Sequence, residues 1–100
     1  MSPLSVRHSI HGIHFEWHAV KAVANRRKHG VEFEQACEVF FDPFLRTLDA
    51  DQEGEEAREA VLGLTEDWQF LYVVFVERGD AFRIVSARRA TRAERRHYED

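Results

Sequence analysis

Residues 68–88 of the chain read WQFLYVVFVERGDAFRIVSAR, and the pattern of this segment indicates the architecture of the rest. It contains two runs rich in β-branched and aromatic residues, Trp68–Glu77 and Phe82–Arg88, separated by Arg78-Gly79-Asp80. A glycine-containing turn between two such runs is a signal for a β-hairpin. The longest apolar run, Phe70–Val76, has the length of a buried strand and is far below the roughly 20 residues that cross a membrane. We therefore expect two paired strands here and no membrane span.

The segments on either side of this hairpin extend the pattern. Two more strands are expected upstream, at Leu45–Leu48 and Ala57–Leu64, with an acidic loop at Asp49–Glu56 between them. No helical pattern interrupts this series of strands, so consecutive strands should pair in antiparallel orientation. Downstream, Thr91-Arg92-Ala93-Glu94 is a capping box that opens a last helix, which reaches about Glu99.

Two helical patterns precede the strands. The first covers His18–His29 and ends at Gly30, with basic side chains in its last turn, where the helix dipole favours them. The second covers Phe33–Phe41, follows the weak N-cap residue Glu32 and stops at Asp42-Pro43. Each pattern has one apolar face, made of Val20, Val23 and Ala24 in the first and of Phe33, Ala36, Cys37 and Phe40 in the second.

The N-terminal end is expected to contribute little to the sheet. Phe15-Glu16-Trp17 is a short strand, and Met1–His14 is an N-terminal extension with loose organisation, in which Ile10 and Ile13 at most start a strand. The element order is then β-α-α-β-β-β-β-α. A chain of 100 residues makes one domain. The sequence thus predicts an α+β fold: an antiparallel β-sheet of four to five strands with two N-terminal helices and a short C-terminal helix.

Charge is distributed unevenly along the chain. The net charge is −4, which by itself argues against a nucleic-acid partner. Residues 1–30 carry five Lys or Arg against one acid, residues 31–80 carry three against fourteen, and residues 81–100 carry six against three. The chain therefore has two basic ends around an acidic middle segment. A polyanion suits the basic ends if the fold brings them together.

Several kinds of site are excluded by residue type. The single cysteine, Cys37, leaves no pair for an internal disulfide, and the N-terminus has no apolar segment typical of a secretory signal, so a cytoplasmic location is expected. No glycine-rich phosphate loop, nucleophile elbow or zinc motif is present, so no cofactor is expected. Four histidines recur between residues 8 and 18, but Gly12 disfavours the helix that would bring them together, and we expect no metal site.

The segment Arg83–Arg92 carries most of the candidate binding residues. A strand ends there in Arg88-Arg89, just before the N-terminus of the last helix. Arginine binds phosphate in a bidentate way and a helix N-terminus adds N–H donors, which together make a phosphate site. The alternative is that these arginines pair with the acids of the middle segment. Alternation places Arg83 and Arg88 on opposite faces of the strand unless a β-bulge intervenes.

Three further side chains have both a functional and a structural interpretation. Arg58 stands among four glutamates and either pairs with one of them or contacts a phosphate from a neighbouring strand. His29 has the side chain best suited to proton transfer near neutral pH, or it caps the last carbonyls of its helix. Trp17 is either a core aromatic or a platform on which a base stacks.

A set of short motifs along the chain follows the pattern of a known family. They are Phe15-Glu16-Trp17, Lys21, Asn25, Lys28-His29-Gly30-Val31, Phe33-Glu34-Gln35-Ala36, Val39-Phe40, Asp42-Pro43, Glu56-Ala57-Arg58, Gly63, Glu77-Arg78-Gly79, the run from Arg83 to Ala90, Glu94 and Tyr98-Glu99. On these motifs the chain resembles the BrnT family of toxins over residues 15–100, which we take as the toxin domain after an extension of residues 1–14. Two positions depart from the family pattern, His18 in place of Asp and Glu32 in place of Ser, and both lie at helix starts.

The resemblance implies a RelE-like fold and the activity of a ribonuclease toxin of a type II toxin–antitoxin system, which cleaves RNA and inhibits translation and growth. It also implies a BrnA-type antitoxin that neutralises the toxin in a hetero-oligomer. The complex then binds its operator DNA through the antitoxin, and no membrane takes part.

Cleavage of RNA without a metal ion needs a group that takes the proton of the 2′-OH, a group that stabilises charge on the phosphate, and a group that protonates the leaving 5′-oxygen. The expected assignments are Arg88 and Arg58 to the phosphate, with Arg83 or Arg89 assisting, His29 and Tyr98 to proton transfer, and Lys28, Arg89, Arg92 and Trp17 to RNA binding. Two alternatives remain open: a nucleic-acid- or protein-binding module without turnover, and an inactive homologue that only binds an antitoxin through the acidic middle segment.

Overall fold

A computed structural model describes residues 3–50 and 57–99 of the chain. Within these ranges, six strands form one sheet in the order β1-β2-β6-β5-β4-β3. The elements are β1 (Ser5–Ile10), β2 (Ile13–His18), α1 (Ala19–His29), α2 (Phe33–Glu38), the 3-10 helix η1 (Val39–Phe41), β3 (Arg46–Asp49), β4 (Glu59–Leu64), β5 (Phe70–Arg78), β6 (Ala81–Arg89) and α3 (Arg92–Glu99). In the described part of the chain, no helix has the length and apolar character needed to cross a membrane.

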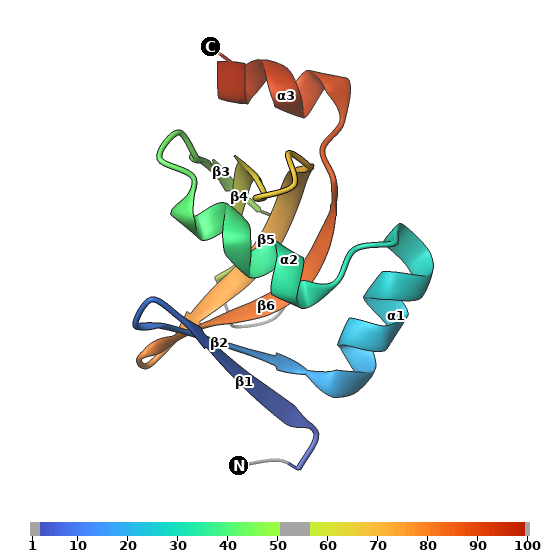
Figure 1. Cartoon of the computed structure of the whole chain (residues 1–100), viewed down its shortest axis with the longest axis vertical. Helices are drawn as coiled ribbons and strands as arrows, with labels where there is room; N and C mark the ends of the chain where they lie inside the picture. The colour runs from blue at the N-terminus through green and yellow to red at the C-terminus, as the bar shows by residue number, and fades with distance from the viewer. Residues whose placement is uncertain (1–2, 51–56, 100) are drawn as a thin grey trace.

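The α+β class, the two early helices and the C-terminal helix are confirmed, but the sheet is mixed rather than antiparallel and has more strands than predicted. Strands β3 to β6 pair in antiparallel succession, as the sequence pattern indicates. Strand β2 pairs with β6 in parallel, with Glu16 opposite Arg83. The reason is topological: α1 and α2 carry the chain from β2 across to β3 at the far edge, and the meander returns strand by strand until β6 lies against β2 (Figure 1).

The prediction of loose organisation before residue 15 is wrong for Ser5–Ile10. This segment forms β1 and pairs with β2 along its whole length, from Ser5 opposite His18 to Ile10 opposite Ile13. The hairpin turn has positive φ at both His11 and Gly12, 50° and 83°. Such turns match the twist of paired strands. The predicted boundary between residues 14 and 15 therefore falls inside β2, and most of the predicted acidic loop, residues 51–56, lies outside the described residues.

One face of the sheet packs against α2 and its flanking residues. Figure 1 shows α2 in front of the sheet, α1 beside β6, and α3 at the far end of the strands. The core consists of Phe15, Trp17, Val61, Leu71, Val73, Phe75, Ile84 and Ala87 from the strands and Val31, Phe33, Ala36, Cys37 and Val39 from the helical side. Burial raises the pKa of the Cys37 thiol to about 12, so this side chain is an inert part of the core.

Helix α1 presents a different face to the protein from the one its apolar residues predict. Val20 and Val23 are 59% and 49% exposed, while Asn25 is buried. The Asn25 amide nitrogen donates to the Ala87 carbonyl at 2.8 Å, and the Asn25 side-chain oxygen accepts from the Ala87 N–H at 3.1 Å. The same nitrogen donates to the Val31 carbonyl at 3.0 Å. Asn25 thus replaces a neighbouring strand at the edge of β6 beyond the short parallel pairing with β2, and this bonding decides which face of α1 turns inward.

A β-bulge in β6 sets the directions of its side chains. Phe75 pairs with Ile84 and Val74 pairs with Ser86, so Val85 is the extra residue. The bulge interrupts the alternation, and both Ile84 and Ala87 join the core. Arg83 and Arg88, which strict alternation places on opposite faces, therefore share the face opposite the core. We call this face, with Glu16, Tyr72, Arg83 and Arg88, the second face of the sheet.

Asn25→Ala is expected to lower the free energy of unfolding by about 3 kcal/mol, because it leaves buried main-chain groups of Ala87 and Val31 without partners. The measurement is urea denaturation followed by circular dichroism. Arg27→Ala, an exposed change on the same helix, is the control and should stay within about 0.5 kcal/mol of the parent. Equal effects of the two substitutions would contradict the role given to Asn25.

Candidate functional site

The second face of the sheet brings Arg83 and Arg88 together with two carboxylates. Arg83 Nη1 donates to Glu16 Oε2 at 3.2 Å across the parallel pairing of β2 and β6. Arg88 donates to both carboxylate oxygens of Glu94, at 2.8 and 2.7 Å. The Arg88 guanidinium also lies over the ring of Tyr72, 4.3 Å from the ring centre. Both arginines are thus paired, but with partners outside the acidic middle segment that the sequence offered.

Glu94 occupies the position where the sequence predicts an anion. Its Oε1 accepts from the Thr91 N–H at 2.8 Å, while the Glu94 N–H donates to Thr91 Oγ1 at 3.2 Å, which confirms the predicted capping box. The Glu94 carboxylate therefore lies between the Arg88 guanidinium and the N-terminus of α3. The hydrogen bonds from Arg88 lower the pKa of Glu94, and burial, which opposes them, does not outweigh them. An ionised, planar oxyanion thus fits this position.

The other predicted arginines lie around this pair. Arg89 is exposed at the end of β6, and its carbonyl accepts from Arg88 Nη1 at 3.2 Å. Arg92 is exposed at the start of α3. Arg58 is half-buried and directly precedes β4, on the other side of β5 from β6. Arg88, Arg89 and Arg92 therefore concentrate positive charge where β6 passes into α3, whereas Arg58, whose neighbour Glu59 pairs with Phe75, lies level with Arg83 toward the other end of β6.

Lys28 and His29 lie in the last turn of α1, which ends at Gly30 with φ 70°. Because Asn25 is bonded to Ala87, this turn is held beside the C-terminal half of β6. The fold thus brings the predicted histidine from one basic end of the chain close to the strand that carries Arg88.

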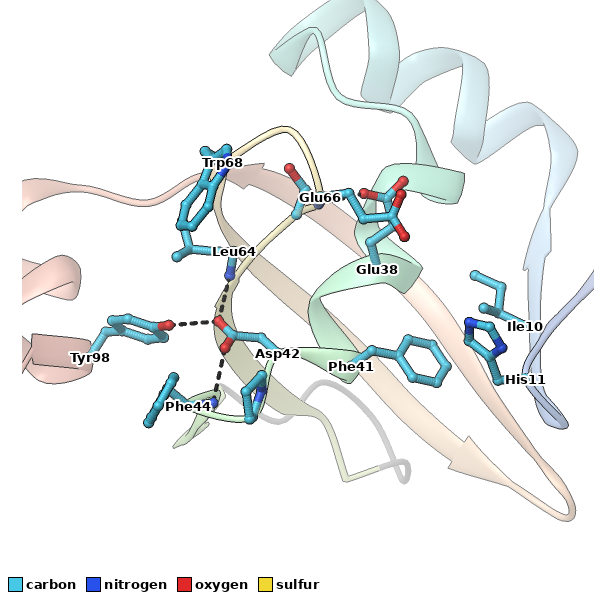
Figure 2. A pocket seen from close by; sticks show the side chains of 12 residues that line it. Ile10, His11, Glu38, Phe41, Asp42, Phe44, Leu64, Glu66, Trp68 and Tyr98 are labelled. Carbon is cyan, nitrogen blue, oxygen red and sulfur yellow. Dashed lines mark hydrogen bonds between the residues drawn. The ribbon is translucent and has the colours of Figure 1, made fainter.

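Tyr98 has a structural partner that its predicted role did not anticipate. Figure 2 shows its hydroxyl, which donates to Asp42 Oδ2 at 2.7 Å. Asp42 also accepts from the Leu64 N–H at 2.8 Å and the Phe44 N–H at 2.9 Å. Burial would raise the pKa of Asp42, but these hydrogen bonds outweigh it and the pKa is lowered. Burial, together with Asp42, raises the pKa of Tyr98 to about 12. At neutral pH Tyr98 is therefore a phenol that tethers α3, which does not favour its use as a base.

The prediction that Trp17 stacks on RNA does not fit its burial. Its side chain is 3% exposed and packs edge-on against Phe33. Trp68, by contrast, reaches solvent: it is 80% exposed and has φ 64°. The sequence indicates a turn at Glu66-Asp67, directly before Trp68. This turn does not by itself indicate whether the apolar residue that follows is buried or exposed.

The histidines near the N-terminus lie on the β1–β2 hairpin and its flank, each with its own partner. His8 and His11 contact the rings of Trp17 and Phe41, and the His14 ring bonds Ser9. His18 is the N-cap of α1 and accepts from the Val20 N–H at 3.2 Å. Over residues 3–50 and 57–99, no group of three or more His, Cys, Asp or Glu side chains is placed to hold a metal ion.

A family model described as the ribonuclease toxin, BrnT, of type II toxin-antitoxin systems matches residues 17–94 of the chain. A search of the curated proteins found no match. The matched range includes β6 with Arg83 and Arg88, and it ends at the Glu94 carboxylate that pairs with Arg88.

Asp42→Asn is expected to destabilise the protein at neutral pH by about 1–2 kcal/mol, because one amide cannot accept all three hydrogen bonds. The folded pKa of Asp42 is lowered from 3.8, so its stabilisation is present above that pH and is lost as the pH falls through the folded value. Urea denaturation at several pH values from neutral to about pH 3 measures the free energy of unfolding of both proteins. The difference in this free energy between parent and variant should become smaller as the pH falls. The pKa of Glu94 is also lowered, but Glu94 is present in both proteins, so its contribution cancels when their free energies of unfolding are subtracted. A difference that stays constant would contradict this account.

Proposed function

The chain belongs to the BrnT family of ribonuclease toxins of type II toxin–antitoxin systems, and we propose that it cleaves RNA on the second face of the sheet, without a metal ion, with Arg88 at the centre of the site. The observation that carries the proposal is the pairing of Arg88 with Glu94. A guanidinium that holds a planar carboxylate through two hydrogen bonds offers the same geometry to a phosphate.

In this mechanism the scissile phosphate takes the place of the Glu94 carboxylate. Arg88 stabilises the charge that develops on the phosphate, since a donor fixed in advance at that position lowers the barrier. Arg83 lies on the same face, and Arg58 and Arg89 assist from either side. Lys28 and Arg92 contact the RNA backbone at the two flanks of β6.

Proton transfer is assigned to His29. Its imidazole takes the proton of the attacking 2′-OH as the 2′-oxygen bonds to phosphorus, and the resulting imidazolium returns that proton to the 5′-oxygen as the bond between that oxygen and phosphorus breaks. The hydrogen bonds between Asn25 and Ala87, which hold α1 against β6, support this assignment. Tyr98 keeps a positioning role, because its proton is committed to Asp42.

Regulation by a partner follows from the family, and we propose that the partner is a BrnA-type antitoxin that forms a hetero-oligomer with the toxin in the cytoplasm. Operator DNA is then bound through the antitoxin. A groove of about 550 Å³ supports this proposal: Phe41, Phe44 and Trp68 line it, and Glu38 and Glu66 stand on its wall (Figure 2). Exposed apolar side chains beside acidic ones suit a basic antitoxin segment with apolar anchors.

A second candidate function is a module that binds nucleic acid or antitoxin without turnover. It is favoured by the fact that both Arg83 and Arg88 already have carboxylate partners. A catalytic site differs from such a module in one measurable respect: Arg88 then affects RNA cleavage and not only RNA binding.

Induction of the protein in bacteria should arrest growth and cleave RNA, and co-expression of the adjacent reading frame should relieve both effects. Arg88→Ala should lower the rate of RNA cleavage by the purified protein about 10²- to 10³-fold, as loss of one transition-state donor does. Arg96→Ala, an exposed change on α3, is the charge-matched control. Intact RNA and normal growth with the unaltered protein would refute the enzyme and leave the binding module.

Glu94→Gln is expected to tighten binding of single-stranded RNA roughly fivefold, because a neutral amide competes less with phosphate for Arg88 while it still caps α3. The binding constant is measured with an RNA analogue that cannot be cleaved. Glu99→Gln removes the same charge from an exposed position of the same helix and should have a smaller effect. Equal effects would show that only net charge matters.

A further inference from the structure

Apart from Arg89, the residues that line the pocket beside it have no role in the mechanism above. We propose that this pocket binds one unpaired nucleotide of single-stranded RNA next to the phosphate held by Arg88, with the base stacked on Trp68 and the backbone phosphate between Arg89 and Arg95. The cavity has a volume of about 290 Å³ and is lined by residues that include Trp68, Gln69, Phe70, Arg89 and Arg95. The proposal rests on the proposed function, because it names a subsite of the same RNA.

Trp68 is presented to solvent by its backbone. Its φ of 64° lies in the left-handed region that a bulky residue rarely adopts. The turn that holds it is closed by three hydrogen bonds: Thr65 N–H to the Gln69 carbonyl at 2.9 Å, Trp68 N–H to the Thr65 carbonyl at 3.0 Å, and Gln69 N–H to Thr65 Oγ1 at 3.0 Å. Strained residues that the surroundings hold in place gather at ligand sites. An indole 80% exposed on such a turn is a ready stacking surface.

The positive charge of the pocket favours a ligand that carries a phosphate. The ionisable side chains that line it are Arg89 and Arg95. Arg95 lies over the ring of Phe70, 5.6 Å from the ring centre, and the Ala90 N–H donates to the Phe70 carbonyl at 2.9 Å, which fixes the end of β6 against β5. An aromatic platform with flanking cations is the arrangement by which proteins hold single strands of any sequence.

The position of the pocket relative to Arg88 determines where the bound RNA strand lies on the protein. Arg88 Nη1 donates to the Arg89 carbonyl at 3.2 Å, so the Arg88 guanidinium lies within hydrogen-bond distance of the main chain of a residue that lines the pocket. On the other side of Trp68, the groove in Figure 2 carries Glu38 and Glu66, which repel a phosphate. RNA is therefore expected on the arginine side of Trp68 and not in the acidic groove.

The test is binding of a single-stranded, 2′-O-methylated oligonucleotide of mixed sequence, which lacks the 2′-OH needed for cleavage. Binding is followed by tryptophan fluorescence. The chain has two tryptophans, and Trp17 is buried, so the quenching reports on Trp68. Trp68→Ala should weaken binding about tenfold, whereas Trp68→Phe should keep most of the affinity, measured by anisotropy of a labelled oligonucleotide.

Arg95 and Arg96 form a matched pair on α3, since both are exposed and only Arg95 lines the pocket. Arg95→Gln should weaken binding more than Arg96→Gln and lower the slope of log affinity against log salt by about 0.7, the value for one phosphate contact with a single strand. Phe44→Ala, in the acidic groove, should leave RNA binding unchanged. Thermal unfolding of each variant checks that the fold is retained.

Unaltered binding by Trp68→Ala, or equal effects of the two arginine changes, would overturn the subsite. The same holds if Trp68→Ala loses binding of the antitoxin encoded by the adjacent reading frame but keeps binding of the oligonucleotide, since Trp68 then belongs to the antitoxin surface. Failure of the proposed function is separate: a protein that binds the oligonucleotide through Trp68 but cleaves no RNA refutes the enzyme and keeps the subsite.

Discussion

Asn25 of α1 completes the edge of β6, because its side chain makes two hydrogen bonds to the main chain of Ala87. Strand β2 pairs with β6 only over residues 14–16 and 81–83, so beyond that point the edge of β6 needs another partner. The Asn25 amide supplies a donor and an acceptor at once, as a strand would. It thereby fixes the face of α1 that turns inward and places Lys28 and His29 beside the strand that carries Arg88.

Local signals predicted those parts of the fold that depend on neighbouring residues. The β5–β6 hairpin follows from two β-rich runs around Gly79, and α3 follows from the box formed by Thr91 and Glu94. The parallel pairing was not accessible in this way, because Glu16 and Arg83 are 67 residues apart and nothing in either segment specifies the other. The face of α1 that packs could not be predicted for the same reason. The apolar periodicity of Val20 and Val23 predicts that their face turns inward, but the hydrogen bonds of Asn25 to the distant residue Ala87 leave both valines exposed.

The candidate site shows the same division between chemistry and placement. Residue type was enough to select Arg83 and Arg88, but one extra residue, Val85, put them on a common face. Residue type alone does not distinguish the two tryptophans, but the structure shows that Trp17 is in the core and Trp68 is at the surface. The departures from the family pattern at helix starts are compensated locally, since His18 caps α1 through Nδ1 and the Gln35 side chain accepts from the Glu32 N–H.

The two carboxylates of the second face differ in how readily RNA can displace them. Glu16 and Arg83 belong to adjacent strands and are 17% and 20% exposed, so their pair is part of the sheet. Glu94 belongs to α3, a helix with no buried residue, whose place also depends on the bond from Tyr98 to Asp42 and on the contact of Tyr98 with Phe70. When a phosphate takes over Arg88, those two ties remain and α3 keeps its position. Glu94 thus neutralises the charge of Arg88 while no RNA is bound. When a phosphate replaces the Glu94 carboxylate, Arg88 loses one charge-assisted pair of hydrogen bonds and gains another, so the number of such pairs does not increase. The net gain from this contact is therefore modest, so affinity for RNA must come largely from the cations and the aromatic surface around it.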